Sequence, residues 1–389
     1  MGQALGDRGR CIAPVFLRFR GGPLKTGWVT ALYLSAVSIG RTTLEPMSPI
    51  GQRDDDAIWP YGPVVIGCGN FGGIGGARDF LGKGMSEETS LASMDEAVEL
   101  GIALFDTAER YAAGESERVV GRWLESRPSS VTQQIRISTK VGPPWIDGRD
   151  GRFDSDYIGP LFSGSLERLG LEAVEVLYTH APDDHPARPS TYDPAPIEAT
   201  LEALESLRAD GRVRRLGASN INAEQLRSAI DAAERMGVAG YEVIQNGYNL
   251  VDPDGDAAVR QLASECGLPY TAYSALGSGV LTGKYRRDEA PPAGSLVEIG
   301  YLDPVTPALH DALDRLRATA AGRGTTTGAL ALAWLIAHPG VAALTTAPSR
   351  TSPHLALVDA ALRLRVSADE AAIWSAWFLD AATDNDTSP

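Results

Sequence analysis

Polar and ionisable side chains recur in this chain at one point of a repeating pattern, at or just after the end of a short apolar run. The set comprises Asp106, Thr107, Lys140, His180, Ser219, Asn220, Gln245, Asn246, Tyr273, Ser274, Thr346, Ser349 and Arg350. Acids, bases and hydroxyls of these types can donate or accept a proton, and amides and guanidinium groups can hold a polar ligand. One such position would carry little weight, but a series along the whole chain predicts a functional site.

The apolar runs themselves predict eight β-strands. They are Val64–Gly67, Ile102–Phe105, Ile135–Thr139, Val174–Tyr178, Val213–Ala218, Tyr241–Ile244, Tyr270–Ala272 and Val341–Leu344. Helical patterns separate them, such as the stretch that Asn222 caps and Gly237 ends. Strands that alternate with helices indicate parallel pairing through right-handed crossovers. Eight such units predict an α/β fold, a closed (β/α)₈ TIM barrel, whose strands all end on the face where such barrels place their chemistry.

The composition is that of a folded globular protein: of 389 residues, 43% are hydrophobic and 22% are charged. The net charge of −15 argues against binding to nucleic acid, which depends on clustered Lys and Arg. Cys11, Cys68 and Cys266 are too few and too far apart for a disulfide framework or a Cys-rich zinc site. A reducing compartment, the cytoplasm, therefore fits best.

The first 53 residues differ in charge from the rest. They hold seven Lys and Arg and two acidic residues, a net charge of +5 that leaves −20 for the remaining 336 residues. Within them Trp28–Ile39 is mostly apolar, but it is well short of the roughly 20 residues that span a bilayer. This stretch is either the apolar core of a targeting peptide or part of a poorly ordered extension, with Met47 as an alternative start. We expect an N-terminal extension over residues 1–55, a single barrel domain over residues 61–380, and no membrane partner.

Because the extension breaks from the pattern of the barrel, we expect it to contribute nothing to the fold. A chain that begins at Met47 should keep its structure and its activity, measured by circular dichroism and by turnover. Loss of soluble expression in the shortened chain would contradict this expectation.

One segment imitates a dinucleotide-binding motif. Gly67–Gly72, of sequence GCGNFG, matches GxGxxG directly after a strand. A Rossmann unit would open a helix at once and would place an acidic residue about 20 positions further on. Here more glycines follow, helix-like sequence begins only near Ser86, and the acid that ends the next strand is Asp106. The pattern favours a glycine-rich loop that lets backbone approach a ligand.

A metal site is an alternative interpretation of one part of the set. His180 is followed closely by Asp183, Asp184 and His185, which are residue types that bind metal ions. A metal-dependent barrel hydrolase would normally show an HxH pair on an early strand, and none of the five histidines forms one. We therefore expect no metal.

The motifs around these positions resemble those of the aldo-keto reductase family. Asp106 and Tyr111 lie five positions apart in FDTAERY, which GESE follows. STKVG around Lys140 and LYTHAPD around His180 resemble the family's lysine and histidine strands. GASN at 217–220, Gln245, YSALG at 273–277 and LTGKY at 281–285 resemble segments that line its cofactor. The likeness covers about residues 61–365 and is greatest to the branch with aflatoxin-aldehyde reductases and potassium-channel β subunits.

The resemblance implies a catalytic set of Asp106, Tyr111, Lys140 and His180. Tyr111 would donate a proton to a carbonyl oxygen, with the pKa of its phenol lowered by the ammonium of Lys140. Asp106 would hold Lys140 in place, and neutral His180 would orient the same oxygen. Taken singly, Asp106 could cap a loop, Tyr111 could be a packing residue and Lys140 could be a solvated strand end. The joint pattern favours catalysis.

The resemblance also implies a nicotinamide cofactor. Tyr273 would offer a flat face to the nicotinamide ring. Asn220, Gln245 and, as a weaker candidate, Ser219 would hydrogen-bond its carboxamide. These groups would fix which face of the ring meets the substrate.

Two further groups of residues would hold the phosphates. The diphosphate would lie against Ser274, Leu276, Gly277 and Lys284. Ser349 and Arg350 would bind the 2′-phosphate, which favours NADP (NADPH) as the cofactor. The chain departs from the family at Thr345–Ala347, where the family has Ile-Pro-Gly, and at His354 and Val358, where it has Gln and Asn. These departures bear on the adenine contacts and on the preference for NADP.

The implied function is reduction of the carbonyl group of an aldehyde, a ketone or a sugar by NADPH. Two alternatives stay open: a nicotinamide-binding regulatory subunit, as channel β subunits are, and a reductase of nucleotide-sugar intermediates. The loops at residues 143–152, 183–194 and 295–304, with Trp145, Phe153 and Tyr301 in or beside them, suggest a partly aromatic substrate pocket.

Overall fold

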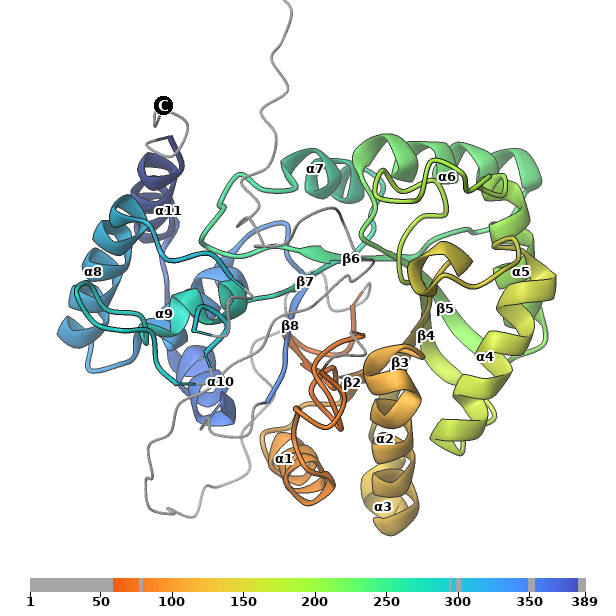
Figure 1. Cartoon of the computed structure of the whole chain (residues 1–389), viewed down its shortest axis with the longest axis horizontal. Helices are drawn as coiled ribbons and strands as arrows, with labels where there is room; N and C mark the ends of the chain where they lie inside the picture. The colour runs from red at the N-terminus through yellow and green to blue at the C-terminus, as the bar shows by residue number, and fades with distance from the viewer. Residues whose placement is uncertain (1–58, 77–79, 294, 299–301, 349–353, 384–389) are drawn as a thin grey trace, which may run out of the picture.

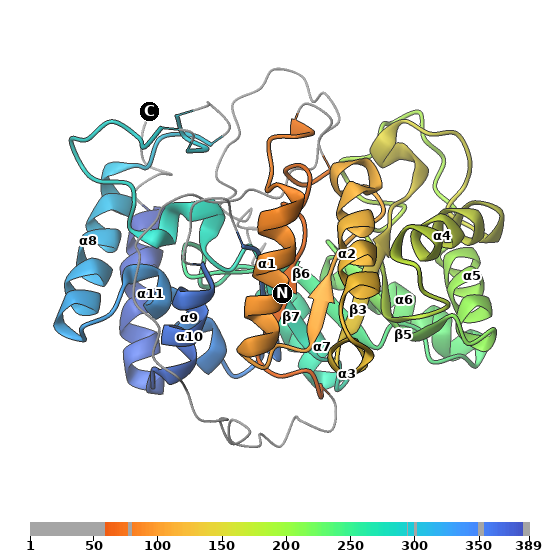
Figure 2. The same cartoon turned by 90° about the horizontal axis from the view of Figure 1, so that it is seen from below.

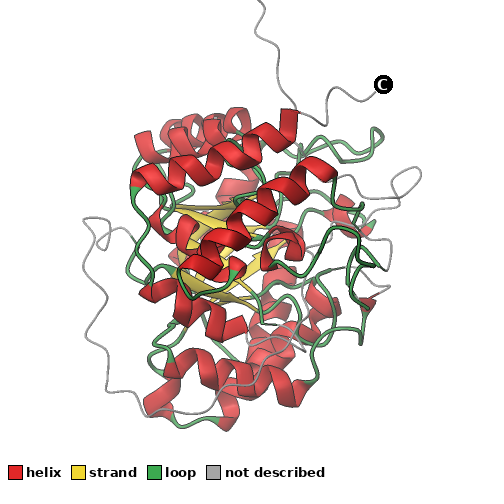
Figure 3. Cartoon of the chain, turned by 90° about the vertical axis from the view of Figure 1, so that its left-hand side faces the viewer, coloured by secondary structure: helices red, strands yellow, loops and turns green. Residues whose placement is uncertain are grey.

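A computed structural model gives the arrangement of the chain and describes residues 59–76, 80–293, 295–298, 302–348 and 354–383. Eight strands form one closed sheet in sequence order, and helices surround it (Figures 1 and 3). The strands are β1 (Val64–Gly67), β2 (Leu104–Asp106), β3 (Arg136–Val141), β4 (Val174–Thr179), β5 (Val213–Ser219), β6 (Val243–Gly247), β7 (Tyr270–Tyr273) and β8 (Ala343–Thr346). All neighbours are parallel, and β8 pairs with β1 to close the ring. The predicted (β/α)₈ barrel is confirmed, and the expected extension over residues 1–55 lies outside the described residues.

Helices follow most strands and form the outer layer. They are α1 (Glu87–Glu99), α2 (Glu115–Ser126), α3 (Ser129–Thr132), α4 (Ser155–Leu169), α5 (Ile197–Ala209), α6 (Ala223–Met236), α7 (Ala257–Glu265), α8 (Pro307–Gly322), α9 (Thr327–Ala337), α10 (His354–Arg363) and α11 (Ala368–Thr383). Short 3₁₀ helices occupy the loops: η3 (Tyr111–Gly114), η4 (Pro144–Asp147) and η5 (Gly277–Thr282). The turned view in Figure 2 shows α8, α9, α10 and α11 gathered on one flank and α4 and α5 on the other.

Several strands of the structure extend beyond the predicted ranges or begin later than those ranges do. β2 includes Asp106, β3 runs past Lys140 to Val141, and β8 lies two residues later than its apolar run. A strand predicted from hydrophobic pattern stops at the first polar side chain, whereas hydrogen bonds between strands depend on backbone groups. Asp106 therefore still pairs with Gly67, and Lys140 with Tyr178. Asp106 and Lys140 therefore belong to the hydrogen-bonded ends of their strands.

Local signals in the sequence explain where the helices begin and end. Asn222 accepts a hydrogen bond from the backbone N–H of Gln225, and the Gln225 side chain bonds back to Asn222, which forms a capping box at the start of α6. Gly237 ends this helix with φ 68°, a left-handed conformation that glycine adopts without strain.

Apolar residues fill two spaces. The larger core lies between the barrel and its helices and includes Trp123, Phe162 and Trp334. A smaller core fills the inside of the barrel, where Trp59 and Tyr61, just before β1, pack edge to face, with ring centres 4.8 Å apart. Because Trp59 and Tyr61 lie at the amino-terminal end of the barrel, the opposite end is left to the polar side chains.

Candidate active site

The four predicted catalytic residues meet at the carboxyl ends of neighbouring strands. Asp106 ends β2, Lys140 lies one residue before the end of β3, and His180 directly follows β4. Tyr111 begins η3, the short helix in the loop after β2. All four side chains are buried, with exposed fractions of 1–8%. The structure therefore brings these four together, and their roles stay predictions.

A buried ion pair between Lys140 and Asp106 forms the centre of the site. The Lys140 ammonium donates to the Asp106 carboxylate and, at 3.0 Å, to the backbone oxygen of Thr107. Ser138 donates to the other oxygen of Asp106 at 2.7 Å. Burial works to lower the pKa of Lys140, but Asp106 and Tyr111 outweigh it, and the net pKa is raised. The lysine therefore stays charged at neutral pH inside the barrel.

Tyr111 lies over this ion pair. The Lys140 nitrogen is 5.0 Å from the centre of the Tyr111 ring, and Gly69 in the loop after β1 lies against the same ring, where an added Cβ would be in ordinary contact at 3.6 Å. Burial raises the pKa of Tyr111, and Lys140 opposes this without overcoming it, so the net pKa is raised. Lys140 thus acts on the pKa of Tyr111 in the expected direction, and the burial of the phenol outweighs it. The phenol keeps its proton at neutral pH.

His180 meets the edge of the same tyrosine. Their ring centres are 5.5 Å apart and their planes nearly perpendicular, at 84°. Burial, Lys140 and Arg110, in that order, lower the pKa of His180 well below its ordinary value. The imidazole is therefore neutral at physiological pH, and in this form one ring N–H can still donate to a carbonyl oxygen. Asn220 donates to the backbone oxygen of His180 at 2.7 Å and so links the histidine to the next part of the site.

A strained turn sets the position of Tyr111. Ala112 and Ala113, which follow it, have φ of 48° and 54°, in the left-handed region that alanine rarely adopts. The backbone N–H of Ala112 donates to the backbone oxygen of Gly75 in the glycine-rich loop at 2.9 Å, which holds the turn in place.

The glycine-rich loop itself does not lead directly into an α-helix. The helix α1 begins only at Glu87, so the segment Gly67–Gly72 does not form a Rossmann unit.

The candidates for the nicotinamide lie beside His180. Ser219 ends β5, Gln245 lies within β6 and Tyr273 ends β7, so three adjacent strands present them at the same face. Asn220 has φ 56°, donates to Ser219 at 3.2 Å and accepts from the Tyr273 hydroxyl. Amide and hydroxyl groups next to an aromatic face fit a nicotinamide ring and its carboxamide.

The candidates for the diphosphate lie in the loop after β7. Ser274, Gly277, Ser278 and Gly279 have φ between 55° and 93°, an irregular backbone that leaves some N–H groups of this loop outside any helix or strand. Leu276 is buried, so it can contribute only its backbone. Burial lowers the pKa of Lys284 at the end of this loop to about 8. A half-desolvated ammonium beside such N–H groups fits a diphosphate.

The last two candidates, Ser349 and Arg350, lie outside the described residues. Just before them Thr346 shares a hydrogen bond with the His354 ring, and both side chains are buried. Val358 is also buried. His354 and Val358 therefore serve the packing of α10 against the barrel in this chain.

Sequence reasoning missed a chain of charges beside Tyr111. Arg110 binds Asp147 in η4 at 3.0 Å, and Arg149 binds both Asp147 and Glu109 at 3.2 Å. Glu109 and Arg110 are almost fully buried, and burial raises the pKa of Glu109 although Arg149 opposes it. The only signal in the sequence is two adjacent charges next to a candidate proton donor.

The expected aromatic pocket is partly wrong. Trp145 in η4 is buried, donates to the backbone oxygen of Asp183 at 3.1 Å and stacks on His185 with ring centres 5.9 Å apart. Phe153 is fully buried in the main core, because it directly precedes α4 and packs beneath it. Tyr301 lies outside the described residues.

Two further searches covered only the described part of the chain. There, no group of three or more His, Cys, Asp or Glu side chains is placed to bind a metal ion. No helix in the same ranges is long and apolar enough to cross a membrane.

Comparisons with known proteins agree with this geometry. A model of the aldo/keto reductase family matches residues 63–377. The chain is 26% identical to the NADH-specific methylglyoxal reductase of Escherichia coli, over 74% of this chain and 87% of that protein. It is 32% identical to a probable voltage-gated potassium channel subunit beta of Arabidopsis thaliana, over 65% of this chain and 75% of that protein.

A solved structure with the same fold is the glycerol dehydrogenase of Gluconobacter oxydans. It is 25% identical, with a TM-score of 0.67 over 84% of this chain and 94% of its own. The resemblance expected from the motifs is confirmed by the family match and by these likenesses. The chain therefore belongs to the aldo/keto reductase family.

Proposed function

We propose that this protein reduces an aldehyde or ketone carbonyl to an alcohol at the site formed by Asp106, Tyr111, Lys140 and His180. The observation that carries the proposal is the buried Lys140–Asp106 pair beneath Tyr111, with His180 at the edge of the same ring. A charged lysine, a protonated phenol and a neutral imidazole are the protonation states that such a reduction requires.

Each of these residues has a separate role. When bound, the nicotinamide supplies the hydride that adds to the carbonyl carbon. Tyr111 gives its proton to the carbonyl oxygen, and the Lys140 ammonium stabilises the phenolate that is left. His180 donates a hydrogen bond to the same oxygen and so orients the substrate. Asp106 holds the ammonium in place and balances its charge.

The test is an activity panel of aldehydes, ketones and sugars with NADPH and with NADH, followed at the absorbance band of the reduced nicotinamide. Turnover of reactive aldehydes is the expected result. The likeness to a potassium channel subunit beta supports a second candidate, a nicotinamide-binding regulatory protein. Tight binding of NADPH without reduction of any carbonyl in the panel would favour that candidate.

We expect NADPH to bind more tightly than NADH. The proposed contact between Arg350 and the 2′-phosphate is a charge-assisted pair worth roughly 1.5–3 kcal/mol. Arg350→Ala should therefore remove most of the preference and leave the affinity for NADH unchanged, as measured by titration of protein fluorescence. One relative is NADH-specific, so equal affinity of the natural chain for both cofactors is the result that would refute the assignment.

A further inference from the structure

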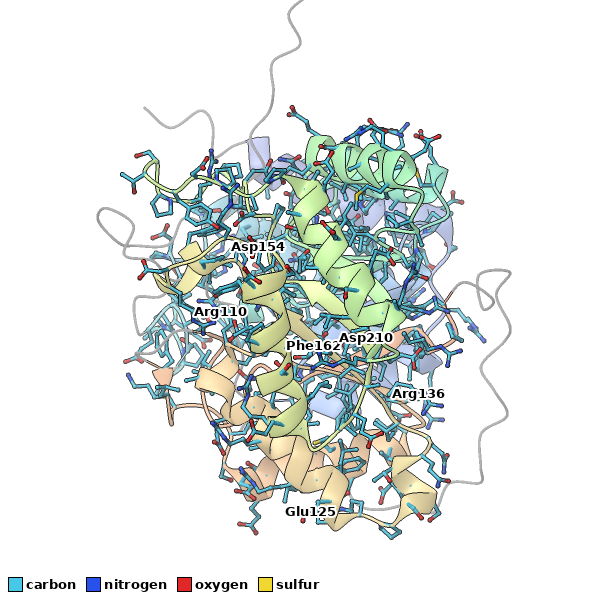
Figure 4. All side chains as sticks on the ribbon, turned by 90° about the vertical axis from the view of Figure 1, so that its right-hand side faces the viewer. Arg110, Glu125, Arg136, Asp154, Phe162 and Asp210 are labelled. Carbon is cyan, nitrogen blue, oxygen red and sulfur yellow. The ribbon has the colours of Figure 1, made fainter. Side chains whose placement is uncertain are left out.

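Arg110 occupies an unusual place for a charged side chain. It directly precedes the proposed proton donor and is 5% exposed. Gly76 lies against it from the glycine-rich loop, where an added Cβ would come within 2.8 Å of the Arg110 Nε. Asp147 in η4 contacts it from the other side at 3.0 Å. Figure 4 shows Arg110 near the end of the molecule where α4 begins at Asp154, away from Arg136 at the start of β3. The guanidinium group therefore lies on the catalytic side, enclosed between two loops.

The charge of Arg110 reaches the reacting groups. It is the third cause, after burial and Lys140, of the lowered pKa of His180. It also opposes, with Lys140, the rise that burial causes in the pKa of Tyr111. Charge effects of this kind weaken with distance, so the guanidinium lies close enough to His180 and Tyr111 to act on both.

The hydrogen-bonding capacity of Arg110 is not filled by the protein. Its Nε is buried, and within the described ranges no acceptor reaches it. Its bond to Asp147 uses a carboxylate that also serves Arg149 at 3.2 Å. A buried donor without an acceptor is unfavourable, and such groups in native proteins usually have a partner that remains to be added. A planar guanidinium matches a carboxylate or a phosphate better than any neutral group.

We propose that Arg110 binds an anionic group, a carboxylate or a phosphate, on the carbonyl substrate. This inference rests on the proposed reduction and specifies its substrate class. Asp147 competes with that anion for the same guanidinium, so it sets how strongly charged substrates are preferred. The anion would bind at the loop that also carries Tyr111, because Arg110 directly precedes it in the chain.

The test compares matched aldehydes that differ only in charge. One pair is para-carboxybenzaldehyde and methyl para-formylbenzoate, and the other is glyceraldehyde phosphate and glyceraldehyde. We expect kcat/KM to favour the anionic member by roughly ten- to a hundredfold, the range of one charge-assisted hydrogen bond. Preference in the first pair alone identifies a carboxylate, and preference in the second alone a phosphate.

Variants then assign the preference to Arg110. Arg110→Met should remove it, Arg110→Lys should keep part of it, and Asp147→Asn should increase it. Arg118→Met is the matched control, because Arg118 is an exposed arginine of α2 that pairs with Glu115. It should leave the ratio of the two kcat/KM values unchanged. If the Arg110→Met variant does not fold, Arg110→Lys, which retains the charge, is the variant that tests the proposal.

Two results have different meanings. Turnover of both members of each pair at equal kcat/KM by the natural chain would overturn the role of Arg110 and leave the proposed reduction intact. An Arg110→Met variant that keeps the kcat/KM ratio of the natural chain would likewise overturn the role of Arg110. No turnover of any of the four aldehydes would instead count against the proposed reduction.

Discussion

Replacement of Tyr111 by Phe should lower the turnover of a reactive aldehyde, such as a nitrobenzaldehyde, by roughly 10²–10⁴-fold, the usual contribution of a general acid. This is about 3–5 kcal/mol of barrier. The substitution removes one oxygen from a buried ring and almost no volume, so the fold should be unaffected. Affinity for NADPH should stay unchanged, because Tyr111 is not among the proposed cofactor contacts, which belong to β5, β6, β7 and the segments that follow β5, β7 and β8 in the sequence.

The measurement is kcat by nicotinamide absorbance, with NADPH affinity determined in parallel. Tyr178→Phe is a matched control, because Tyr178 is also buried and its ring centre lies 5.8 Å from the Lys140 nitrogen. Turnover of Tyr111→Phe within about threefold of the natural chain, with intact NADPH binding, would show that Tyr111 is not the acid.

Lys140→Met should lower turnover over the same range by a different route. Lys140 opposes the rise in the pKa of Tyr111 more than any other group, so without it the phenol pKa moves further up. Alcohol oxidation needs the deprotonated phenol, so the rise of this activity with pH should shift to higher pH in the variant. A shift to lower pH would contradict the role given to Lys140.

The lysine variant needs a control for stability, because it leaves Asp106 buried without its partner. Breaking such a pair typically costs about 3–5 kcal/mol. Adding Asp106→Asn should recover much of the unfolding midpoint without restoring activity. Tyr111→Phe combined with Lys140→Met should be barely slower than either single variant, because the two residues act on the same proton.

The strand ends explain why the catalytic set could be predicted from the sequence. Three of the candidates, Asp106, Lys140 and His180, follow apolar runs. A closed parallel barrel brings such positions to one face, regardless of the length and packing of the surrounding helices. Tyr111 lies five residues past a strand end, in a turn with left-handed alanines that no propensity indicates. Tyr111 is a candidate only because FDTAERY resembles a motif of the aldo-keto reductase family.

The charges around the site could not be predicted in the same way. Arg110 pairs with Asp147, which is 37 residues away in another loop, and Glu109 pairs with Arg149 across 40 residues. Loop conformation decides these pairs, and neither spacing nor hydrophobic pattern reports it. The net pKa of Tyr111 could not be predicted for a related reason, because the burial of the phenol depends on how the loop after β1 covers the ring.

The aromatic cluster at the far end of the barrel matters for how the protein could be immobilised. Trp59 and Tyr61 anchor the chain at the amino-terminal ends of the strands, opposite the face where Asp106, Lys140 and His180 meet. Trp59, the first of the described residues, therefore lies on the side away from the reacting groups. A solid support coupled immediately ahead of this residue would turn the catalytic face toward the flowing solution.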